Sequence, residues 1–133
     1  MRDILKSYQS MKRKVRGIRS LIFGPDKGDV RRLRAKYGSP PSQFITLENG
    51  DTVHLRDEGG HEAPPIVFLH GHSEDLHTWD LLVKQLVESF RVIRLDLRRH
   101  GLTGPAPDNE YRIENYVADL SMVIDHLGID SFV

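Results

Sequence analysis

The chain has 133 residues, of which 38% are apolar and 29% charged, as expected for one globular domain, and it has no cysteine. The lack of cysteine excludes a disulfide frame, a thiolate metal site and a cysteine nucleophile. The net charge of zero conceals an asymmetry, because residues 1–36 hold twelve Lys and Arg against three Asp, whereas residues 37–133 hold seven against sixteen Asp and Glu. No apolar run is long enough to span a bilayer, and the N-terminus lacks the apolar core of a secretory signal, so we expect a cytoplasmic protein.

Residues 1–38 form a predicted basic helical arm. Apolar residues recur at three- and four-residue steps through residues 1–22, and Lys and Arg fill much of the remaining surface, which predicts an amphipathic helix. Such a helix can lie on an anionic membrane, so peripheral membrane contact is one expectation and packing on the domain or on a partner is the other. Residues 30–38 predict a second short helix. The sequence Gly38-Ser39-Pro40-Pro41-Ser42 predicts a linker, which places a domain boundary between residues 38 and 39.

Residues 39–133 predict strands that alternate with helices. Asn49-Gly50 is typical of a tight hairpin turn and lies between two strand-like runs, Gln43–Leu47 and Thr52–Arg56. The later elements are a strand at Ile66–Leu69, expected to be buried on both faces, a helix at Leu76–Phe90, a strand at Arg91–Leu97, a helix at Ile113–Leu127 that Gly128 ends, and a strand that begins at Ile129–Val133. This order favours an α/β fold, with a largely parallel sheet and helices on both faces.

Two loops follow the carboxyl ends of strands, where ligands bind in such sheets: residues 70–75 and residues 98–107. In the first loop, Gly71 permits a sharp turn, and backbone N–H groups at such a turn can stabilise an oxyanion. Asp96 ends the strand before the second loop and is a candidate substrate contact.

The strand followed by His70-Gly71-His72 resembles the α/β-hydrolase family, in which a strand and a His-Gly-x turn form one side of the oxyanion hole. Further segments are similar to that family in the same order: residues 53–59 to its second strand, 77–80 to the helix after the oxyanion loop, 92–97 and 100–105 to the next strand and loop, and 111–120 to the helix before the nucleophile strand. The resemblance covers residues 43–133 and is to esterases and epoxide hydrolases. It implies the N-terminal half of an α/β-hydrolase sheet, an antiparallel hairpin and then parallel strands.

The resemblance also implies roles for residues. The backbone N–H of His72 would be an oxyanion donor at the turn that Gly71 makes, and His70 would brace the loop; Ser73 and Asp96 complete the candidate binding residues. The implied activity is hydrolysis of an ester or related small molecule, without a cofactor, through a Ser or Asp nucleophile. That nucleophile follows the fifth strand, which begins only at Ile129–Val133, so we expect this chain to lack nucleophile, acid and base, and whether it is an enzyme stays open. Arg99 stands where the family usually has a small residue, which predicts backbone strain if that position is left-handed.

Two alternatives remain. The run His70-Gly71-His72-Ser73-Glu74-Asp75 nearly matches the His-x-His-x-Asp-His signature of metallo-β-lactamases, in which His70 and His72 would bind zinc, although Glu74 and Asp75 depart from it. The other alternative is a non-catalytic fragment that acts by association, through self-pairing of an exposed sheet edge. We expect no metal, and the acidic body argues against nucleic-acid binding.

Overall fold

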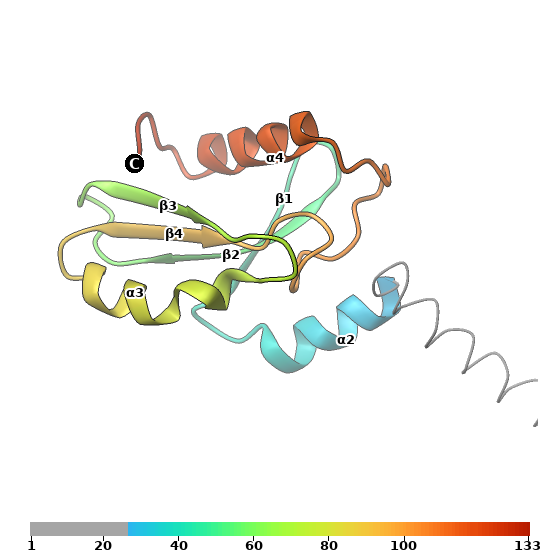
Figure 1. The fold of residues 1–133 in the computed structure, drawn as a ribbon, viewed down its shortest axis with the longest axis horizontal. Coiled ribbons are helices and arrows are strands. Elements are labelled where there is room, and N and C mark those ends of the chain that lie inside the picture. Colours follow the sequence, from blue (N-terminus) through green and yellow to red (C-terminus); the bar gives the residue numbers. More distant parts are fainter. Residues whose placement is uncertain (1–26) are drawn as a thin grey trace, which may run out of the picture.

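The computed structural model describes residues 27–133, so the amphipathic helix predicted in residues 1–22 lies outside the described residues. Four strands form one mixed sheet in the order β1-β2-β4-β3 (Figure 1). Their bounds are β1 Gln43–Thr46, β2 Thr52–Glu58, β3 Pro65–Leu69 and β4 Arg91–Leu95. β2 pairs antiparallel with β1 and with β4, and β3 pairs parallel with β4. The predicted hairpin followed by parallel strands is thus confirmed.

Two helices cover opposite faces of this sheet, α3 (Asp80–Leu86) on one and α4 (Ile113–His126) on the other (Figure 1). The helix predicted over residues 76–90 is shorter and divided, since a 3₁₀ helix, η1 (Leu76–Trp79), precedes α3. The side chain of Asp75 begins η1 by accepting a hydrogen bond from the His77 N–H. Gly128, with φ of 63°, ends the α4 region as predicted, because a left-handed residue there closes the last helical turn.

The core lies between the sheet and α4. It is centred on Val53 and Leu55 of β2, Leu95 of β4 and Val123 of α4, each at most 2% exposed. The alternate residues of β2 and β4 face α3 instead, and there Arg94 pairs with Glu58 and Asp80. The face toward α3 thus carries a charged cluster around Arg94, whose own side chain is 3% exposed.

β3 is less buried than the sequence predicts. Its residues are half-buried and Leu69 is 42% exposed, whereas all five residues of β4 are buried. The reason is position, because β4 is central and β3 is the last of the four strands. Beyond β3, Val133 makes two backbone hydrogen bonds: the Val67 N–H donates to its carbonyl at 2.8 Å, and its own N–H donates to Pro65 at 3.1 Å. Residues 129–133 are not a regular strand, but Val133 lies where the next strand is predicted.

The helix before the sheet is α2, Lys27–Tyr37, which corresponds to the helix predicted over residues 30–38. Val30 is 4% exposed, and the Arg34 guanidinium donates to the carbonyls of Leu102 and Thr103, both at 2.7 Å. These bonds hold α2 on the loop after β4, so residues 27–37 pack against the rest of the chain; the boundary between residues 38 and 39 stays a prediction. Within residues 27–133, no helix combines the length and the apolar character needed to cross a membrane.

Candidate functional site

A pocket of about 370 Å³ lies at the carboxyl ends of β3 and β4, and both predicted loops line it. Its lining is Leu69, His70, Gly71 and His72 after β3, Leu97 and His100 after β4, and Ile113, Tyr116, Val117 and Leu120 of α4. Most of these side chains are apolar. An apolar pocket with a few polar groups, at this end of an α/β sheet, is the usual form of a small-molecule site.

His70 braces the floor of this pocket. Its Nε2 accepts a hydrogen bond from the Leu97 N–H at 3.0 Å, and its Nδ1 donates to the Gly71 carbonyl at 2.8 Å. An amide N–H can only donate and a carbonyl can only accept, so the ring is the neutral tautomer with its proton on Nδ1. The ring, 4% exposed, thereby joins the loop after β3 to the end of β4. Because both nitrogens are engaged, this geometry does not provide the zinc ligand that the metallo-β-lactamase alternative requires.

The turn itself is shaped by Glu74, whose carboxylate accepts a hydrogen bond from the Gly71 N–H at 3.0 Å. Ser73 follows in a left-handed conformation, with φ of 63°, and its exposed side chain is not part of the pocket lining. His72 lies between these residues and lines the pocket. Its backbone N–H has no hydrogen-bond acceptor among residues 27–133. A residue that lines the apolar pocket thus has a backbone N–H without an acceptor among the described residues.

Asp96 is a second brace and is not part of the lining of this pocket. It is 1% exposed; its Oδ1 accepts from the Leu76 N–H at 2.8 Å, and its Oδ2 accepts from the Leu102 N–H at 2.7 Å and from His54 Nδ1 at 2.6 Å. Burial alone would raise the pKa of Asp96, but these three donors outweigh burial and hold the pKa below its ordinary value. The sequence made Asp96 a candidate substrate contact, whereas in the structure it ties together the segments after β3 and β4.

The same carboxylate heads a Ser–His–Asp chain of hydrogen bonds, since His54 Nε2 lies 2.8 Å from the Ser42 hydroxyl. The order is that of a catalytic triad. His54 and Asp96 are each 1% exposed, however, and none of the three residues lines the pocket. Phe44 stacks on the His54 ring at 5.0 Å, so this histidine is a packing residue whose two nitrogens are both satisfied.

The loop after β4 contributes His100, which sequence reasoning did not select. Its Nδ1 donates to the Arg98 carbonyl at 3.0 Å, and its ring lies 4.9 Å from His70 and 6.2 Å from His72. The available signal was its place in a loop that follows a strand. Its neighbour Arg99 has φ of 68°, which confirms the left-handed position, and its guanidinium lies 5.2 Å from the Tyr111 ring centroid.

Arg98 fastens this loop to α4. Its guanidinium makes two hydrogen bonds to Asp119, at 2.6 and 2.8 Å, and pairs with Asp51 at 3.2 Å. The hydrogen bonds to Asp119 raise the pKa of Arg98. Burial, and then the nearby charge of Asp119, raise the pKa of Asp51. Arg98 thus neutralises two buried carboxylates from two different segments, an arrangement that the sequence did not reveal.

Known proteins share the fold of this chain. Residues 64–133 match the alpha/beta hydrolase fold family, and the chain belongs to that family. It is 31% identical over 91 residues to a bifunctional esterase/perhydrolase of Acinetobacter calcoaceticus, covering 68% of this chain and 33% of that protein. It is 27% identical over 93 residues to epoxide hydrolase 1 of Caenorhabditis elegans, covering 69% of this chain and 23% of that protein.

Among solved structures, an epoxide hydrolase from metagenomes of hot environments superposes with a TM-score of 0.64 and 32% identity, over 68% of this chain and 31% of that one. The chain therefore spans a third or less of the length of these three relatives.

Proposed function

We propose that this segment forms one wall of the active site of a hydrolase that acts on esters or related small apolar molecules. One observation carries the proposal: His72, whose backbone N–H has no acceptor among residues 27–133, lines an apolar pocket, on a loop that His70 and Asp96 hold in place. The names of the relatives, an esterase/perhydrolase and epoxide hydrolases, support the reaction class.

The proposed chemistry is electrostatic. Attack on an ester carbonyl produces an oxyanion, and a donor already in position stabilises it without reorganisation. In this fold the second donor is the N–H after the nucleophile, which lies on a turn at the end of the next strand. Val133 pairs with β3 on the side away from β4, and a strand continued from there would end beside His72.

The test is a pair of substitutions at one position, made in the protein extended past residue 133 until it includes nucleophile, acid and base. His72→Pro removes the backbone N–H, whereas the matched control His72→Ala removes only the side chain. Loss of one oxyanion donor lowers kcat by about 10²–10³-fold. We expect that loss for H72P with p-nitrophenyl esters and a much smaller change for H72A. Equal rates for the two variants, both correctly folded, would contradict the assignment.

The alternative, a non-catalytic role by association, stays a prediction. β3 is the last of the four strands, and Leu69 on it is 42% exposed. Sedimentation velocity of the 133-residue chain tests this alternative. Concentration-dependent dimers would support it, and a monomer with a single cooperative melt would count against it.

A further inference from the structure

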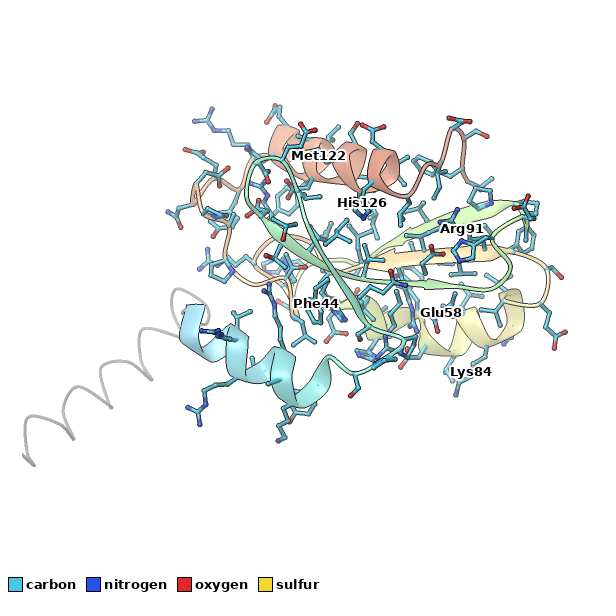
Figure 2. The ribbon with its side chains drawn as sticks, turned by 180° about the vertical axis from the view of Figure 1, so that it is seen from behind. Phe44, Glu58, Lys84, Arg91, Met122 and His126 are labelled. Carbon is cyan, nitrogen blue, oxygen red and sulfur yellow. The ribbon has the colours of Figure 1, made fainter. Side chains whose placement is uncertain are left out.

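One side of α2 faces the protein and the other faces solvent. Val30 and Arg34 lie against the loop after β4, and the Arg34 guanidinium also lies 5.2 Å from the Phe44 ring centroid. Phe44 belongs to β1 and lies at the part of the sheet nearest α2 (Figure 2). A Cβ on Gly38 would lie 2.6 Å from the Arg34 carbonyl and 2.8 Å from the Phe44 ring, so the end of the helix sits close to β1. These contacts hold α2 in place on the rest of the protein.

The solvent-facing side of α2 carries both basic and apolar residues. Arg32, Leu33, Lys36 and Tyr37 form what we term the α2 patch. Arg32 and Lys36 are four residues apart, as are Leu33 and Tyr37, so each pair is aligned along the helix and the two pairs lie next to each other. All four are exposed, Leu33 by 36% and Tyr37 by 54%. The Lys36 ammonium lies 4.7 Å from the Tyr37 ring centroid, so charge and apolar surface are contiguous. No Asp or Glu lies between Val30 and Tyr37.

We propose that the α2 patch docks on an anionic lipid surface. Lys and Arg near such a surface are attracted to its headgroups, and Leu and Tyr side chains enter the boundary between headgroups and acyl chains. Charge complementarity favours this occupant over a neutral protein partner, because residues 1–26 add seven Lys and Arg against two Asp immediately before α2. The body of the protein is acidic, so the attraction is confined to this end of the chain.

The position of α2 also determines which end of the sheet would face the lipid. Arg34 holds α2 to the carbonyls of Leu102 and Thr103, in the loop that carries His100 of the pocket. Figure 1 shows α2 at the end of the sheet toward which β3 and β4 point. Docking would therefore bring the pocket end of the protein toward the membrane.

The experiment measures partitioning of the full 133-residue chain onto phosphatidylcholine vesicles with and without phosphatidylserine, by co-flotation. Each cation near an anionic surface contributes roughly five-fold to partitioning, so R32Q/K36Q should bind phosphatidylserine vesicles roughly 25-fold more weakly. The matched control K84Q/R112Q removes two exposed charges elsewhere, on α3 and before α4. Figure 2 shows Lys84 well apart from α2. The control should bind within a few-fold of the unchanged chain, and circular dichroism should show all variants folded.

A second variant separates the apolar contribution. L33S/Y37S keeps every charge, so it should bind more weakly at high salt, where charge attraction is screened, than the unchanged chain does. The proposal is overturned if R32Q/K36Q binds like the unchanged chain, if the control is weakened equally, or if pure phosphatidylcholine is bound as well. Binding of duplex DNA or RNA at concentrations that give no vesicle binding would also overturn it.

Discussion

Replacing Arg98 by methionine should destabilise the protein severely. The Arg98 side chain is 1% exposed, and its partners Asp51 and Asp119 are 6% and 7% exposed. The substitution leaves both carboxylates buried without a cation. Removing one partner of a buried ion pair costs about 3–5 kcal/mol, a large part of the 5–15 kcal/mol that holds a typical domain folded. We expect the melting temperature to fall by roughly 10 °C or more.

Urea unfolding at several pH values is the decisive assay. In R98M, Asp51 loses the charge of Arg98 that opposes the effect of burial on its pKa, so the folded state binds a proton at Asp51 more tightly than the unfolded chain does. The loss in free energy of unfolding relative to the unchanged protein should therefore be largest at neutral pH and shrink as the pH falls below about 5. The double variant R98M/D119L should be less destabilised than R98M, because one orphaned carboxylate is gone. A deficit below about 1 kcal/mol at pH 7, or one that does not change with pH, would refute the reasoning.

Three further outcomes are expected. The pKa of Asp96 is lowered in the folded state, so ionised Asp96 stabilises the fold above the ordinary Asp pKa of about 3.9, and this stabilisation is lost as the pH falls through the lower folded pKa. In D96N, the free energy of unfolding measured by urea should therefore fall less steeply with acid. Gly101→Ala would place a Cβ 2.0 Å from the Asp96 carboxylate, whereas a Cβ on Gly50, which is also left-handed, would have nothing within 4 Å. G50A therefore bears only the left-handed penalty of about 1–2 kcal/mol, and G101A should lower the melting temperature well beyond G50A. The 133-residue chain alone should not hydrolyse p-nitrophenyl esters above background; turnover that Ser42→Ala abolished would instead assign activity to the buried Ser–His–Asp chain.

The order of elements was predictable because it depends on local patterns. Asn49-Gly50 specified the hairpin, and Gly128 marked the end of the last helix. Burial of β3 was not predictable, since it depends on which neighbour occupies each edge of the sheet. The division of the helix after the first loop was also missed, because the apolar spacing of residues 76–90 suits both η1 and α3.

The candidate site was predictable only in outline. The resemblance located the loop of His70 to His72, and it anticipated the left-handed Arg99. It could not identify the partners of Asp96, because Leu76 is 20 residues away along the chain and His54 is 42 residues away. A carboxylate at the end of a strand suits substrate contact and internal bracing equally well in sequence. Only the fold shows that three donors already occupy this one.

These braces give the proposed oxyanion donor its physical basis. A backbone N–H stabilises a developing charge only if it is held in place before the charge appears, since reorganisation during the reaction would cost what the hydrogen bond contributes. The His72 loop is held through side chains on both sides, by the His70 ring bonded to Leu97 and by Asp96 bonded to Leu76. Both contacts lead to the end of β4, the most buried strand of the four. Substitutions at Asp96 should therefore lower catalysis by displacing the donor, and the extended protein should show this as a fall in kcat with little change in KM.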